Sequence, residues 1–214
     1  MKTEMNKGYK NQIIISTMAT LVPIVAGLLL WNKLPDQIAT HFDSSGIADG
    51  WSGRLFTVIG LPLIMTVVHL ILVVALVNDP KKNNISRKMM SVCMWIVPVI
   101  SCVVMSGVLG GALGMKIDIS KIIDMLLGLM FIILGNYMTK THQNYTVGIK
   151  LPWTLNSREN WNRTHRLAGK LFILTGFVFL IDMFINTSLL VIAVALVAAF
   201  VPMIYSFVLY KKGI

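Results

Sequence analysis

The run LFTVIGLPLIMTVVHLILVVALV, Leu55–Val77, decides the fold class of this 214-residue chain. It contains no Asp, Glu, Lys or Arg, and a helix of about 20 such residues crosses the ~30 Å hydrocarbon core of a bilayer. The whole chain is 56% apolar and only 13% charged, which is far from the composition of soluble proteins. The sequence therefore predicts an integral membrane protein.

Five further apolar runs are long enough to cross a bilayer as helices. They are Ile13–Leu30, Met89–Gly111, Ile119–Met138, Leu167–Phe184 and Leu189–Tyr210. We therefore predict an all-α, polytopic membrane protein with six transmembrane helices. We expect an N-terminal membrane half, 1–115, and a C-terminal membrane half, 116–214, with three spans each.

The positive charges predict how these spans are oriented. Fifteen of the 19 Lys and Arg residues lie before the first run, between the second and third, within or beside the fourth connection, or after the sixth. The opposite side keeps Lys33, Arg54, Lys116 and Lys121. Because Lys and Arg are enriched in cytoplasmic loops, both termini are predicted to be cytoplasmic. The net charge of +10 then reflects membrane orientation, and we expect no direct binding of nucleic acid.

The predicted extracellular loop, about 31–54, is the candidate surface for a molecule that arrives from outside. Its candidate binding residues are His41, Phe42, Asp43, Asp49 and Trp51. Three glycines in this loop indicate turns, and Phe42 and Trp51 are suited to the membrane surface. Since the spacing of His and Asp matches neither a zinc signature nor an EF-hand loop, we predict no metal site.

Ionisable residues within the runs give the alternative function. His69, Asp124 and Asp182 lie in or near apolar runs, where charged groups are costly and are often functional. They would matter most in a small transporter or channel, but structural hydrogen bonding or contact with interfacial water also explains them. The chain has no GxSxG, HExxH or Gly-rich phosphate loop, so we expect neither an enzyme nor a cofactor.

A polar segment, GIKLPWTLNSRENWNRTHRLAG from Gly148 to Gly169, separates two apolar runs on the predicted cytoplasmic side. Pro152 predicts an extended Leu151, and Asn156 with Glu159 predicts an N-cap and a helix that begins near Ser157. Two interpretations remain open at this point. The segment is an interfacial elbow that places Trp153 and Trp161 among lipid headgroups, or a docking surface for a protein partner.

This segment resembles the SdpI family of bacterial membrane immunity proteins. The matching residues are Gly135-Asn136, Asn144, Gly148, Pro152-Trp153-Thr154-Leu155, Trp161, His165-Arg166 and Gly169. The first loop is similar to the domain that often precedes this motif, through Leu34-Pro35, Ile38, His41 and Asp49-Gly50. The chain departs from the pattern at Lys150, which replaces an Arg and lacks its planar, bidentate donor geometry.

The resemblance implies a multi-pass protein of the bacterial plasma membrane that confers resistance to a secreted, SdpC-type peptide toxin. The partners that it implies are the lipid bilayer, the toxin and a small winged-helix repressor held at the membrane for signalling. It also defines a signature segment, about 139–166, with nearby positions of the motif. Its candidate residues are Asn136, Asn144, Gly148, Lys150, Pro152, Trp153, Thr154, Trp161, His165 and Arg166.

Overall fold

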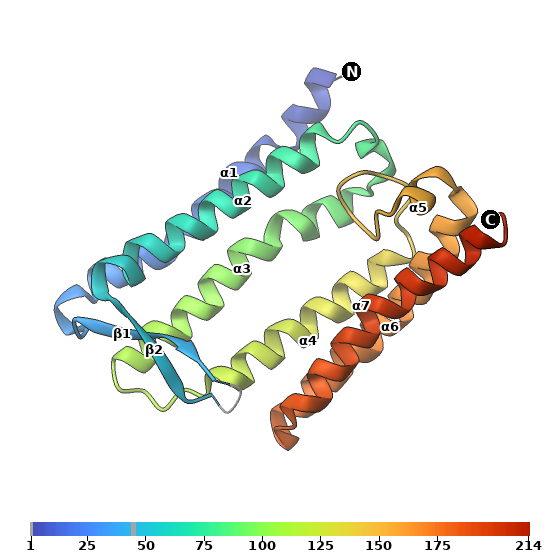
Figure 1. Cartoon of the computed structure of the whole chain (residues 1–214). Helices are drawn as coiled ribbons and strands as arrows, with labels where there is room; N and C mark the ends of the chain where they lie inside the picture. The colour runs from blue at the N-terminus through green and yellow to red at the C-terminus, as the bar shows by residue number, and fades with distance from the viewer. Residues whose placement is uncertain (1, 44–45) are drawn as a thin grey trace. The chain divides into compact units, whose positions relative to one another are not determined.

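The computed structural model describes residues 2–43 and 46–214, with the side chains of all of these except residues 2–8 and 188 (Figure 1). In this part of the chain, six helices are long and apolar enough to cross a membrane. They are α1 Lys2–Leu29, α2 Leu61–Asn78, α3 Arg87–Ala112, α4 Ile119–Met138, α6 Arg158–Ile185 and α7 Ser188–Lys211. The prediction of a polytopic helical membrane protein is confirmed. The side of the membrane that the termini face stays a prediction.

The helix boundaries follow from local sequence. A π-helical turn, Phe56–Gly60, leads directly into α2, and Pro62, which has no backbone N–H to donate, lies just after this turn. Ser157 caps α6 by accepting a hydrogen bond from the Asn160 N–H. At the other end, Asn186 is left-handed with a φ of 56°, a conformation that Asn tolerates at a helix C-terminus.

The chain divides into two compact units, which we describe separately. The first unit consists of Met1–Val74 and Ser91–Ile123 and holds α1, most of α2 and most of α3. Its apolar core is made by the buried side chains Leu34, Ile38, Val58, Met105, Val108 and Leu109. The division of the chain into halves 1–115 and 116–214 stays a prediction.

A β-hairpin follows α1 in the first unit (Figure 1). Strand β1, Gln37–Phe42, pairs antiparallel with β2, Ala48–Gly53, and the register is irregular around His41. Ile38 anchors the hairpin, because its side chain is only 1% exposed within the apolar core. The Arg54 guanidinium closes the base by donating to the Trp31 carbonyl oxygen at 3.0 Å and by pairing with Asp36. The sequence predicted only turns here, and the strands are a finding of the structure.

The second unit consists of Ala75–Met90 and Asp124–Ile214. It contains a short helix, α5 Pro152–Asn156, and α6 and α7 pack side by side (Figure 1). Helices α4 and α6 are in backbone contact, since a Cβ atom at Gly135 or Gly169 would lie 2.7 Å from the carbonyl oxygen of the other glycine. Small residues allow such close packing in a bilayer, where hydrophobic burial does not drive helices together.

Candidate functional site

The hairpin brings two of its five predicted binding residues together. His41 Nδ1 lies 2.5 Å from Asp49 Oδ1, and both side chains are exposed. The Trp51 side chain is 59% exposed, whereas Phe42 is half-buried. Asp43 has a local role, because its Oδ1 accepts the Ile47 N–H at 2.8 Å. Among the described side chains, those of residues 9–43, 46–187 and 189–214, no three His, Cys, Asp or Glu residues gather as a metal site would require.

The ionisable residues of the spans make local structural contacts. His69 is fully buried, and its Nε2 atom lies 3.1 Å from the Ser16 hydroxyl of α1. Asp182 helps to end α6, because its Oδ1 accepts the Thr187 N–H at 2.8 Å and the Thr187 hydroxyl at 2.6 Å. Asp124 lies half-buried in the second turn of α4. A role of these residues in transport stays a prediction.

Asn144 organises the connection between α4 and α5. Its Oδ1 atom accepts the N–H groups of Thr146 at 3.0 Å and Val147 at 2.6 Å. Its Nδ2 atom donates to the His142 carbonyl at 2.8 Å. Because the Asn144 side chain is 0% exposed, its hydrogen bonds take the place of those that the backbone N–H and C=O groups of this loop would otherwise make to water.

Asp79, which is not among the predicted site residues, also stabilises this connection. Its Oδ2 atom accepts the Tyr145 N–H at 2.9 Å and the Thr146 hydroxyl at 2.7 Å, and Oδ1 accepts the Lys81 N–H at 2.7 Å. The residue is only 4% exposed. The signal available in the sequence was an acidic residue directly after an apolar run, at the start of a lysine-rich connection.

Trp161, His165 and Gly148 form the centre of the signature segment. The Trp161 and His165 rings stack at a centroid distance of 3.9 Å, and Trp161 Nε1 donates to the Thr141 carbonyl at 2.7 Å. His165 Nε2 accepts the Ile149 N–H at 3.0 Å, so Nδ1 carries the hydrogen and donates to the Trp161 carbonyl at 2.8 Å. Both ring nitrogens of His165 therefore make hydrogen bonds to the protein backbone.

Only glycine fits at position 148. Its φ of +117° disfavours any side chain, and a Cβ atom there would lie 2.4 Å from His165 Nε2. The loop backbone thereby approaches the imidazole closely enough for the adjacent Ile149 N–H to reach it.

The structure corrects the predicted start of the helix. Leu151 is extended as predicted, but a short helix that was not predicted, α5, begins at Pro152. Thr154 caps α5, since its hydroxyl accepts the Leu151 N–H at 2.9 Å and donates to the Ile149 carbonyl at 2.8 Å. Ser157 is the N-cap of α6, because Asn156 is the last residue of α5.

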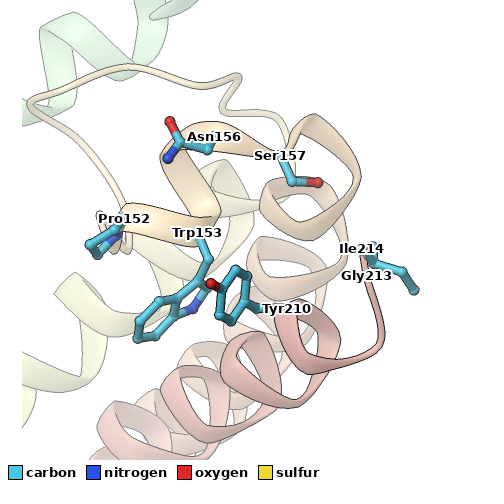
Figure 2. Close-up of a pocket in the computed structure, with 7 residues that line it drawn as sticks. All are labelled: Pro152, Trp153, Asn156, Ser157, Tyr210, Gly213 and Ile214. Carbon is cyan, nitrogen blue, oxygen red and sulfur yellow. The ribbon is translucent and has the colours of Figure 1, made fainter.

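Trp153 joins α5 to the end of α7. Its Nε1 atom donates to the Ser206 hydroxyl at 2.9 Å, and its ring stacks on the Tyr210 ring with 5.7 Å between the ring centroids. These two aromatic residues line an open pocket of about 540 Å³, which Figure 2 shows together with Pro152, Asn156 and Ser157. The pocket offers an accessible surface in the signature segment for another molecule.

The ten signature residues therefore fall into two groups. Inward-facing or partly buried residues are Asn144, Gly148, Trp153, Thr154, Trp161 and His165; exposed residues are Asn136, Lys150, Pro152 and Arg166. Because Trp161 is 0% exposed, it does not lie among lipid headgroups, and the interfacial-elbow interpretation is wrong for this residue. Most of the motif holds the loop and helix termini in place.

The fold and this internally bonded segment define a polytopic helical membrane protein. Residues 140–206 match the SdpI/YfhL protein family, which confirms the resemblance found in the sequence. Residues 18–66 match a domain of unknown function, DUF1648, which covers the C-terminal part of α1, the hairpin and the start of α2.

A similar protein is known over nearly the full length. The chain is 25% identical over 206 residues to the immunity protein SdpI of Bacillus subtilis (strain 168), covering 93% of this chain and 96% of that protein. No solved structure is significantly similar. With its six apolar helices, the chain is a multi-pass protein of the bacterial plasma membrane.

Proposed function

We propose that the protein confers immunity against a secreted antimicrobial peptide toxin. The observation that carries the proposal is the similarity to an immunity protein over almost the whole of both chains. The SdpI/YfhL match in the C-terminal part supports it independently of that single relative.

The β-hairpin is the surface that we assign to the toxin. Trp51 is 59% and Ile47 66% exposed, and they lie beside the exposed pair of His41 and Asp49. Apolar and charged groups side by side suit an amphipathic peptide that lies on the membrane surface. The Arg54 contacts at the base fix the hairpin before the toxin binds, which reduces the entropy lost on binding. The predicted orientation places this surface outside the cell.

The test is survival of a toxin-sensitive bacterium that produces the full chain. The wild type should raise survival under toxin challenge, and Trp51→Ala should lower it. Loss of a tryptophan at the centre of an interface costs about 2 kcal/mol or more, which corresponds to about 30-fold weaker binding. Trp95→Ala, in α3, is the matched control for loss of a tryptophan. Survival of Trp51→Ala equal to that of the wild type, at equal protein level, would exclude the hairpin as the toxin surface. Lack of protection by the wild type itself would contradict the immunity function.

The finer proposal is that the protein also holds a small winged-helix repressor at the membrane. The Trp153 and Tyr210 pocket supports it, because this pocket is open and lies on the predicted cytoplasmic side. Trp153→Ala should reduce toxin-dependent induction of the repressed operon while protein level is unchanged. Trp161→Ala cannot serve this purpose, since it would remove a fully buried side chain and unfold the segment. Normal induction with Trp153→Ala would refute this role.

A further inference from the structure

A second pocket, which also lies in the second unit, is lined entirely by polar residues. It has a volume of about 260 Å³ and is lined by Asn84, His142, Gln143, Arg158 and Asn162. These come from the connection before α3, the connection after α4 and the first turns of α6. In the described part of the chain, no carboxylate lines this pocket. Its chemistry therefore favours an anion.

Hydrogen bonds within the protein fix part of the wall. Asn84 Nδ2 donates to the Gln143 carbonyl at 2.6 Å. Gln143 Nε2 donates to the carbonyls of Thr154 at 3.0 Å and Leu155 at 3.2 Å. The pocket is thus shaped by the folded signature segment and does not depend on a ligand to form.

No acidic side chain in the described part of the chain pairs with Arg158, the cationic group of the pocket. The nearest acid in sequence, Glu159, is taken by Arg163, whose Nε atom donates to it at 2.6 Å. Among the side chains that the structure describes, at residues 9–43, 46–187 and 189–214, none makes an ion pair or a hydrogen bond with the Arg158 side chain. Asn162 lies one helical turn after Arg158 and lines the same pocket. A guanidinium and an amide thus face one small space without a bound partner.

We propose that this pocket binds the phosphate headgroup of an anionic phospholipid. A guanidinium presents donors in a planar geometry that matches phosphate oxygens. The pocket lies at the N-terminal end of α6, just ahead of its apolar part, where a membrane-spanning helix meets the headgroup layer. Basic pockets at the cytoplasmic ends of such helices characteristically take lipid headgroups.

The test is lipid binding by the purified full chain. Phosphatidylglycerol is titrated into the protein in phosphatidylcholine nanodiscs, and bound phosphatidylglycerol is measured by native mass spectrometry. Arg158→Gln should weaken binding at least about tenfold, because it removes charge-assisted hydrogen bonds. Lys170→Gln removes an exposed positive charge from the same helix outside the pocket, and should weaken binding by no more than about fivefold.

Three results would overturn the proposal. Equal effects of Arg158→Gln and Lys170→Gln would mean that the lipid is held by diffuse attraction to the positive surface. Equal binding of phosphatidylcholine and phosphatidylglycerol by the wild type would exclude recognition of the anionic lipid. If inorganic phosphate binds the protein in phosphatidylcholine nanodiscs as strongly as phosphatidylglycerol does, the ligand is free phosphate. Asn162→Ala is the second variant if Arg158→Gln does not fold, and it should also weaken binding more than Lys170→Gln does.

Discussion

Replacement of Gly148 by alanine tests how the signature segment is held together. Two costs arise. A side chain at a φ of +117° strains the backbone by about 1–3 kcal/mol. The new Cβ atom would lie 2.4 Å from His165 Nε2, so the ring must move and its hydrogen bond from the Ile149 N–H is lost. An unsatisfied buried polar group costs about 1–3 kcal/mol. We expect a total loss of about 2–6 kcal/mol.

Chemical unfolding of the purified protein in lipid micelles, followed by circular dichroism, measures this loss. Gly114→Ala is the matched control, because Gly114 has a φ of +83° but no atom within 4 Å of its Cβ position. That variant should lose only the backbone term of about 1–3 kcal/mol. If Gly148→Ala is no less stable than Gly114→Ala, the close packing of Gly148 on His165 does not contribute to stability.

Two further predictions concern the same segment. Trp161→Phe keeps an aromatic ring against His165 but leaves the buried Thr141 carbonyl without its hydrogen-bond donor. The free energy of unfolding, measured by denaturant titration, should therefore fall by about 1–3 kcal/mol. An unchanged free energy of unfolding would show that another donor replaces the indole N–H. Asp79→Asn removes the charge that accepts the Tyr145 N–H and the Thr146 hydroxyl, and each charged hydrogen bond contributes about 1.5–3 kcal/mol. Amide hydrogen exchange at residue 145 should accelerate by at least about tenfold, and unaltered protection there would contradict the assigned bond.

The transmembrane helices were predictable because the bilayer imposes a simple rule of length and polarity. The predicted run Ile119–Met138 has the same bounds as α4. The fifth membrane-spanning helix, α6, shows the limit of this rule. Its apolar run begins at Leu167, but the helix itself begins nine residues earlier, at Arg158. Those first residues include Asn160, Trp161 and Thr164, which are 0% exposed. Hydropathy does not detect them because polar side chains with internal partners can be buried without being apolar.

The candidate sites were harder to predict because their contacts join distant parts of the sequence. The Asp79 contact spans 66 residues to Tyr145, and no local pattern indicates such a pairing. The hairpin was missed because its strands do not alternate cleanly, with a buried Ile38 but glycines at positions 50 and 53 in β2. The N-cap of α6 was predicted one residue early, since Asn156 and Ser157 are both suitable caps and only the end of α5 decides between them.

The carboxylate of Asp79 has a consequence for the order in which the chain can fold during synthesis. Asp79 precedes Tyr145 and Thr146 by 66 and 67 residues. At 5–20 residues per second, roughly 3–13 s pass between their additions to the growing chain. The first two helices therefore enter the membrane while this carboxylate still lacks two of its three hydrogen-bond donors. The connection after α2 can reach its final form only when the chain beyond α4 has been made, so a truncated chain that ends at α4 leaves this acid exposed to water.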